Sequence, residues 1–194
     1  MTARQQHGFE YQDYVIKQLN LKGDNNYIGK NDAYYKEENG INLPVLIKCI
    51  KQGSAIDLSD YRRNKNRNSV FILIVGFWNG EKTNVVEEYI LYPPIEWWRS
   101  LFITPQGFDE EIYKFLNEIS NDKSDDILWE KKTKEFKNIW NYSWIEVQPE
   151  FEDKWGKVCS ERVVQLRFKR DHKTQKRIQC AIPNKKFYEY FITW

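Results

Sequence analysis

Histidine, cysteine and methionine are scarce in this chain of 194 residues, which has two, three and one of them respectively. The three cysteines are odd in number and none belongs to a CxxC pair, so the sequence supports neither a disulfide framework nor a zinc knuckle. Because His7 and His172 are the only histidines, a histidine-rich metal site is a poor candidate too.

Long apolar runs are also lacking. No run approaches the roughly 18 residues that a membrane helix needs, and the N-terminal segment has no continuous apolar region of the kind found in secretion signals. We therefore expect a cytoplasmic protein with no membrane contact. A chain of this length buries one substantial core, which predicts a single domain over residues 1–194.

The charge is unevenly distributed, although the net charge is only +2. Residues 167–186 have eight Lys or Arg against one Asp, residues 61–67 have four Lys or Arg, and residues 109–130 are largely acidic. Basic clusters suit a polyphosphate because each neutralised phosphate releases counterions, although solvated basic faces would have the same composition. The candidate DNA-binding residues are Arg62, Arg63, Lys65, Arg167, Lys169, Arg170, His172, Lys173, Lys176 and Arg177.

Hydrophobic spacing predicts an α/β fold, with a central mixed β-sheet flanked by helices. The last two predicted strands are joined by a short basic segment, which indicates a C-terminal basic β-hairpin. The predicted helices are residues 7–21, 95–102, 108–120 and 125–140, with a short one over 183–191 capped at Asn184; the predicted strands are residues 31–35, 43–51, 70–78, 87–92, 144–151, 162–171 and 176–182.

Two nuclease signatures overlap within residues 25–54. The Tyr27-Ile28-Gly29 triplet matches half of the GIY-YIG signature. That signature needs a GIY strand about ten residues upstream, but the chain there has YVIKQLNLKGD, which is the end of a predicted helix. We interpret the triplet as ordinary strand and turn residues.

The second signature is a strand with Asp32, a hairpin turn, a strand with Lys48 inside the run LPVLIKCIK, and then the buried strand VFILIVGFW. In this order, the segment from Gly8 to Trp78 resembles the core of the PD-(D/E)xK nucleases, and in particular a small type II restriction endonuclease. The resemblance implies a restriction-endonuclease-like core. Residues 1–94 would then be the catalytic core, and residues 95–194 would supply helical and β-hairpin elements for DNA recognition.

By position, the resemblance assigns Asp32 to the metal-binding acid, Lys48 to the catalytic lysine and Glu10 to the glutamate that often assists from the first helix. It implies Mg²⁺, which takes hard oxygen ligands and retains several waters, so that one or two carboxylates suffice. A lysine against an apolar strand can orient or help deprotonate the attacking water. Side chains alternate along a strand, so only one of Lys48 and Lys51 should face the site; Lys51 is the second choice.

The sequence departs from the family pattern at Leu46, which stands where the second acid is expected. Asp60 or Asp57, in the segment GSAIDLSDYRRN, is the candidate for the missing metal-binding carboxylate.

We therefore expect a Mg²⁺-dependent endonuclease on double-stranded DNA, most simply a type II restriction enzyme. Most such enzymes recognise palindromes, which implies a homodimer that matches the two half-sites. The departure at Leu46 leaves open a non-catalytic nucleic-acid-binding module. An aromatic-rich protein-interaction domain is a third possibility, but it would leave both basic clusters unexplained.

Overall fold

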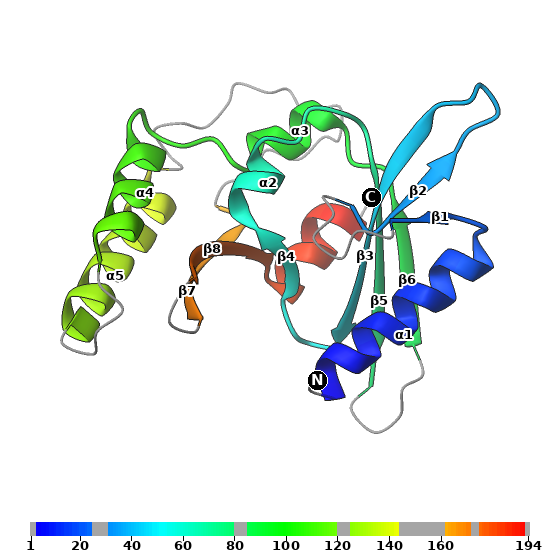
Figure 1. Cartoon of the computed structure of the whole chain (residues 1–194), viewed down its shortest axis with the longest axis horizontal. Helices are drawn as coiled ribbons and strands as arrows, with labels where there is room; N and C mark the ends of the chain where they lie inside the picture. The colour runs from blue at the N-terminus through cyan, green and yellow to red at the C-terminus, as the bar shows by residue number, and fades with distance from the viewer. Residues whose placement is uncertain are drawn as a thin grey trace.

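The computed structural model of the chain describes residues 3–24, 31–79, 85–119, 125–143, 162–171 and 175–192. Figure 1 shows how the elements are arranged, with α4 and α5 at the opposite end of the molecule from α1. The helices are α1 (Ala3–Gln18), α2 (Tyr61–Lys65), α3 (Ile95–Ser100), α4 (Phe108–Glu118), α5 (Asp126–Tyr142) and α7 (Asn184–Phe187), which continues as a π-helical turn η2 (Tyr188–Ile192). The strands are β1 (Lys22–Gly23), β2 (Ala33–Lys36), β3 (Asn42–Lys51), β4 (Ile56–Asp60), β5 (Ile72–Trp78), β6 (Val85–Leu91), β7 (Gln165–Asp171) and β8 (Gln175–Ile182).

Within the described residues, the strands form two sheets. The large sheet has the order β1-β2-β3-β5-β6, in which β3 and β5 run parallel and the other neighbours run antiparallel. The small sheet has the order β4-β8-β7 and is antiparallel. The prediction of an α/β fold with a central mixed sheet flanked by helices is confirmed.

The β2–β3 pairing confirms the hairpin that the sequence predicts around the turn at Gly40. Gly40 has a φ of 85°, a left-handed conformation that glycine adopts at no steric cost. The small sheet, in contrast, is only partly expected, because the sequence predicts the strands over residues 162–171 and 176–182 but not their third partner, β4. Residues 56–60 have no predicted strand, yet they pair with the far C-terminal strand β8.

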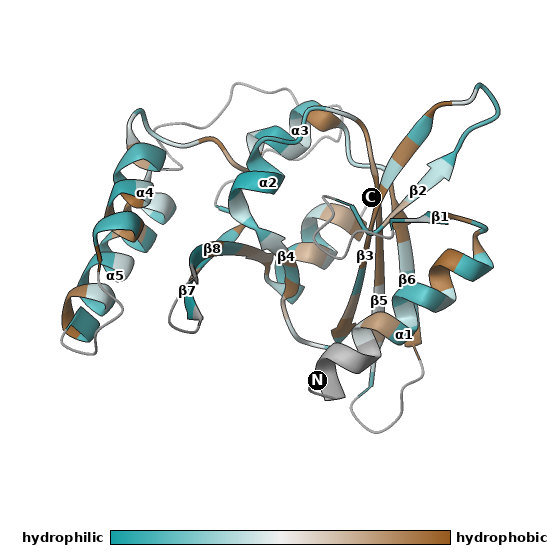
Figure 2. Cartoon of the chain, in the orientation of Figure 1, coloured by the Kyte–Doolittle hydropathy of each residue, from teal (hydrophilic) through white to brown (hydrophobic). Residues whose placement is uncertain are grey.

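Helix α1 packs against one face of the large sheet. Its buried residues Tyr11 and Val15 contact a cluster that includes Val45, Ile47 and Ile72 from β3 and β5. These two strands are mostly hydrophobic along their length in Figure 2, whereas α4 and α5 are mostly hydrophilic. A strand buried on both faces has this continuous apolar composition, as the sequence predicts for residues 70–78.

The opposite face of the large sheet belongs to a larger core. This core joins β3 and β5 to the small sheet, α3, α4, α5 and α7. Trp98 is fully buried there, and its indole N–H donates to the backbone oxygen of Asn64 at 3.1 Å. Trp140 is buried too, and its indole N–H donates to the backbone oxygen of Val164 at 2.8 Å. Both indoles are therefore structural, because burial of a Trp requires a partner for its N–H.

The cap of the C-terminal helix lies one residue earlier than the sequence predicts. Pro183 is the N-cap, with φ −55° and ψ 136°, and its carbonyl accepts the N–H of Phe187 at 2.9 Å. Asn184 is already helical, so its prediction as the cap was wrong. The predicted strand over residues 144–151 lies outside the described residues.

In the described part of the chain, no helix combines the length and the apolar composition that crossing a membrane requires.

Candidate active site

Asp32 and Lys48 lie close together where β2 and β3 of the large sheet are neighbours. Asp32 immediately precedes β2, and its backbone N–H donates to the oxygen of Val45 at 2.9 Å. Its Oδ2 accepts the backbone N–H of Ile47 at 2.7 Å and lies 3.6 Å from Nζ of Lys48. The backbone thus fixes the position of the carboxylate, and the lysine next along β3 approaches the same oxygen.

Strand alternation decides which lysine faces Asp32. Leu46 and Ile50 are buried in the larger core, whereas Ile47 faces α1, so Lys48 lies on the same side as Leu46 and Ile50. The side chains of Lys48 and Asp32 are 16% and 26% exposed, which leaves the pair open to a ligand on one side. Lys51 is exposed at the end of β3, so the structure brings Lys48, and not Lys51, to Asp32.

Leu46 is 5% exposed and belongs to the larger core, so the position of the expected second acid is apolar. Of the two substitutes, Asp57 accepts the N–H of Ser59 at 2.8 Å, within a β-bulge where Ser59 has a φ of 68°. Asp60 is the N-cap of α2 and accepts the N–H of Arg63 at 2.7 Å. Each of these carboxylates therefore has one oxygen engaged with the local backbone.

The thiol of Cys180 links these two carboxylates to Lys48. Burial raises its pKa well above the ordinary value, Asp57 and Asp60 raise the pKa further, and Lys48 lowers it. The two carboxylates and the ammonium group of Lys48 therefore all act on the same buried thiol. Asp57 and Asp60 thus remain the candidates for a second carboxylate near Lys48.

Glu10 is exposed on α1, the helix that covers the face of the sheet opposite to Lys48. From the same helix, Nε2 of Gln12 donates to the backbone oxygen of Asp32 at 3.5 Å. Among the described residues, no three His, Cys, Asp or Glu side chains are grouped to hold a metal ion. The predicted metal ligands Asp32, Glu10 and Asp60 are therefore not gathered into one cluster.

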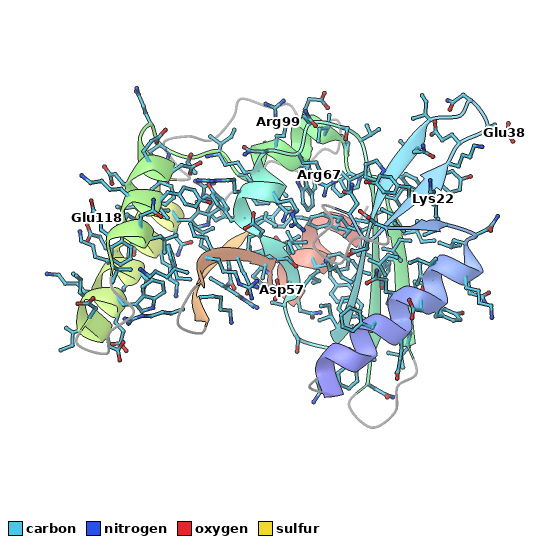
Figure 3. All side chains as sticks on the ribbon, viewed as in Figure 1. Lys22, Glu38, Asp57, Arg67, Arg99 and Glu118 are labelled. Carbon is cyan, nitrogen blue, oxygen red and sulfur yellow. The ribbon has the colours of Figure 1, made fainter. Side chains whose placement is uncertain are left out.

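Arg67 is a site residue that the sequence does not single out, because there it belongs to an ordinary basic cluster. Arg67, which Figure 3 labels, is 2% exposed. It lies over the Phe71 ring at 4.4 Å and donates from Nη1 to Oδ1 of Asn31 at 3.3 Å. Burial and the nearby Arg63 lower its pKa to about 10, whereas Asp32 raises it. Its Nε and Nη2 have no hydrogen-bond partner within the described part of the chain. Arg67 thus places a buried positive charge beside Asn31 and Asp32.

The other basic residues within 61–67 are Arg62, Arg63 and Lys65, and the structure packs Arg62 and Lys65 against other side chains of the chain. The Arg62 guanidinium lies 3.7 Å from the centre of the Tyr113 ring. Nζ of Lys65 lies 2.6 Å from Asp109 and donates to Oγ1 of Thr104 at 2.7 Å. Of the predicted DNA-binding residues in this cluster, Lys65 therefore has an acidic partner within the chain.

The pairing register of β7 and β8 shows which basic residues of these two strands share a face of the small sheet. Phe168 pairs with Ile178 and packs against the larger core, so Arg170 and its partner Lys176 share the core-side face. Arg170 also forms an ion pair with Asp126 of α5. The other face has the pairs Lys169–Arg177 and Arg167–Gln179. The predicted His172 and Lys173 lie outside the described residues.

Comparisons of the chain with protein-family models, with curated proteins and with solved structures found no match. A function must therefore be inferred from the chemistry of the Asp32–Lys48 pair and from the distribution of positive charge.

Proposed function

We propose that the chain is a Mg²⁺-dependent endonuclease of the PD-(D/E)xK type, which hydrolyses phosphodiester bonds of double-stranded DNA as a type II restriction enzyme. The observation that supports this most strongly is the Asp32–Lys48 pair: Asp32 immediately precedes β2, Lys48 lies on the neighbouring antiparallel strand β3, and Oδ2 of Asp32 is 3.6 Å from Nζ of Lys48. Along the chain, α1 is followed by the antiparallel strands β1, β2 and β3, then by β4 of the small sheet, α2, and β5, which runs parallel to β3. The resemblance implies the succession of a helix, the β2–β3 hairpin and a further buried strand; β4 and α2 are additions to it.

The donor chemistry of the site fits a magnesium ion. Asp32 offers a carboxylate whose orientation is set by the N–H of Ile47, and Asp57 or Asp60 would add a second one. Hard oxygen ligands of this kind, few in number, suit Mg²⁺ because the ion keeps several of its waters. When bound, the ion would neutralise charge on the attacked phosphate. Lys48 would orient the attacking water and balance the charge that develops on the phosphate.

A homodimer is part of the proposal, since two identical sites would cut the two strands of a palindromic sequence. The face of the β7–β8 pair opposite to Phe168 and Arg170, here called the open face, is the proposed DNA-reading surface. A two-stranded ribbon fits the major groove, where Arg and Lys address guanine and Gln addresses adenine. Arg167, Lys169, Arg177 and Gln179 supply these groups from one face.

Removal of divalent metal is the first test. The purified protein is incubated with long unmethylated DNAs of mixed sequence and Mg²⁺, and parallel reactions contain EDTA. We expect discrete fragments with Mg²⁺ and intact DNA with EDTA, because hydrolysis needs the cation at the phosphate. Intact DNA in every Mg²⁺ reaction, at protein concentrations that retain the DNA in a gel, would instead favour binding without cleavage.

Such a non-catalytic DNA-binding module is the second candidate. Two observations favour it: Leu46 is buried at the position of the second acid, and the described residues hold no cluster of three metal-ligating side chains.

The two faces of the β7–β8 pair give a second prediction. Lys169→Ala and Arg177→Ala should each weaken DNA binding, by about 1–3 kcal/mol if the residue reads a base, or with a salt slope lower by about one unit if it contacts phosphate. Arg170→Ala is the matched control, because its guanidinium is directed to α5 and paired with Asp126. Binding curves at several salt concentrations measure both quantities. Equal loss in all three variants would argue against reading by this face.

A further inference from the structure

A basic cavity of about 710 Å³ lies where α5, β7 and the start of α7 come together. The residues that line it are distant in the sequence from Asp32 and Lys48. Among the described residues that line the cavity, five are Lys or Arg and none is Asp or Glu. Its volume is within the range of ordinary ligand pockets. The cationic lining residues are Lys137, Arg162, Arg167, Lys185 and Lys186.

Arg162 is the anchored cation of this cavity. It is 8% exposed, its Nε donates to the backbone oxygen of Trp140 at 2.8 Å, and its guanidinium lies 3.9 Å from the centre of the Trp140 ring. Nη2 also donates to Oγ of Ser143 at 3.4 Å. Burial lowers its pKa to about 10, so it is still charged at neutral pH. These contacts hold the guanidinium in one orientation before any ligand arrives, which reduces the entropy lost on binding.

The other cations differ in how far they are engaged. Lys137 and Lys185 are exposed, and Arg167 is half-buried on the open face of β7. Lys186 lies 3.7 Å from Glu189, so part of its charge is already balanced. The cavity therefore keeps a clear excess of positive charge.

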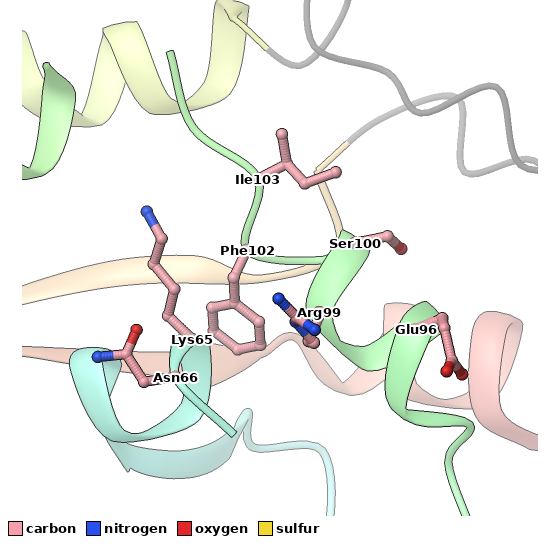
Figure 4. A pocket seen from close by; sticks show the side chains of 7 residues that line it. All are labelled: Lys65, Asn66, Glu96, Arg99, Ser100, Phe102 and Ile103. Atoms are coloured by element: carbon pink, nitrogen blue, oxygen red, sulfur yellow. The ribbon is translucent and has the colours of Figure 1, made fainter. Parts of the chain in front are cut away.

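A second cavity shows that this lining is not general for the protein. It measures about 380 Å³ and lies between α2 and α3, where Lys65 and Arg99 share the wall with Glu96 (Figure 4). Its charges are mixed, and Lys65 is also paired with Asp109. An anion would be favoured in the larger cavity and not in this one.

We propose that the basic cavity is a binding site for phosphate groups. Phosphate oxygens accept charge-assisted hydrogen bonds from ammonium and guanidinium groups, and the described lining offers several such cations with no carboxylate among them. Arg162 adds fixed positive charge, since its Nε and Nη2 already donate within the chain. Arg167 lines the cavity and also belongs to the open face of the β7–β8 pair, so the two basic surfaces are continuous. The favoured source of phosphate is thus the backbone of the DNA in the proposed function, and a free nucleoside triphosphate is the other source.

The test uses the double variant Lys137→Glu/Lys185→Glu, which changes two exposed cavity residues and leaves the proposed DNA-reading residues intact. The matched control is Lys131→Glu/Lys134→Glu, on exposed positions of the same helix α5 outside the cavity lining. Thermal unfolding of both variants checks that the fold is kept. Binding to a 30-base-pair duplex is measured across salt concentrations in EDTA, so that no DNA is cut, and binding to ATP is measured by calorimetry.

We expect the cavity variant to bind DNA at least about tenfold more weakly, with a salt slope lower by about two units, and the control to change much less. If the cavity variant instead loses ATP binding and keeps DNA binding, the phosphate site stands and its source is a free nucleotide. Unchanged binding of both ligands, or equal losses in the control variant, would overturn the proposal. These readouts are separate from cleavage, so a protein that binds through the cavity but never cuts DNA refutes the nuclease and not the phosphate site.

Discussion

Asp32→Asn and Lys48→Met are each expected to lower the rate of DNA cleavage by roughly 10²–10⁴-fold, while the dissociation constant for DNA stays within about tenfold. The reason is that the two side chains converge on one point of the large sheet, where Oδ2 of Asp32 lies 3.6 Å from Nζ of Lys48. Loss of either group removes the metal ligand or the group that orients water. Phosphate contacts elsewhere still hold the DNA.

The measurement is single-turnover cleavage of a DNA that the wild-type protein cuts, with gel-shift binding of the same DNA in EDTA. Lys51→Met is the matched control, because Lys51 is on the same strand but exposed and on the opposite face. It should cleave at close to the wild-type rate. Wild-type cleavage by the Asp32 or Lys48 variant would remove the assignment of the active site.

The same assay identifies the second carboxylate. Glu10→Gln, Asp57→Asn and Asp60→Asn keep the shape of each side chain and remove its charge, and Asn retains the helix-capping ability that Asp60 uses. We expect the activity loss to fall on Asp57 or Asp60, since Glu10 is exposed on α1, which covers the face of the sheet opposite to Lys48. A loss confined to Glu10→Gln would instead place the metal on the α1 side.

Gly76→Ala is expected to lower the free energy of unfolding by about 1–3 kcal/mol, because the added carbon overfills the interface between α1 and β5. A Cβ at Gly76 would lie 2.4 Å from Cζ and 2.6 Å from the hydroxyl oxygen of Tyr11. The ring cannot move away without loss, since Tyr11 is 5% exposed and its hydroxyl donates to Oε2 of Glu88 at 2.6 Å.

Urea unfolding followed by far-UV circular dichroism measures this change. Gly23→Ala is the control, because its nearest neighbour would be the Ile16 side chain at an ordinary 3.7 Å. A double-mutant cycle with Tyr11→Ala then isolates the contact: Gly76→Ala should cost much less once the ring is gone. Equal costs in the two backgrounds would show that strand propensity, and not the Tyr11 ring, limits position 76.

Local patterns were sufficient for the elements that bury their own apolar residues. The run VFILIVGFW has no polar interruption, and the structure buries β5 on both faces inside the large sheet, between β3 and β6. The alternation that separates Lys48 from Lys51 follows from strand geometry alone, and it places Lys48 on the side of Leu46 and Ile50 as expected. The prediction of Asp32 and Lys48 as neighbours needed only a hairpin between them.

Long-range pairing was not accessible in this way. Strand β4 is five residues long and is stabilised by β8, more than a hundred residues later, as the pair Ile56–Ile182 shows. Nothing within residues 56–60 indicates this partner. The extra sheet in turn decides the surroundings of Asp57 and Asp60, because a bulge and a helix cap use one oxygen of each.

The basic residues show the same division. The sequence by itself determined where positive charge is concentrated, that the fold is of the α/β class, and that Asp32 and Lys48 are neighbours across a hairpin. These features depend on composition and on periods of a few residues. The tertiary structure alone decided that Arg67 is buried beside Asn31, that Arg170 pairs with Asp126, and that five cations surround one cavity. The physical reason is that burial and ion pairing depend on which distant segments pack together, and Lys or Arg side chains have the same local pattern whether they meet solvent, a carboxylate or a cavity.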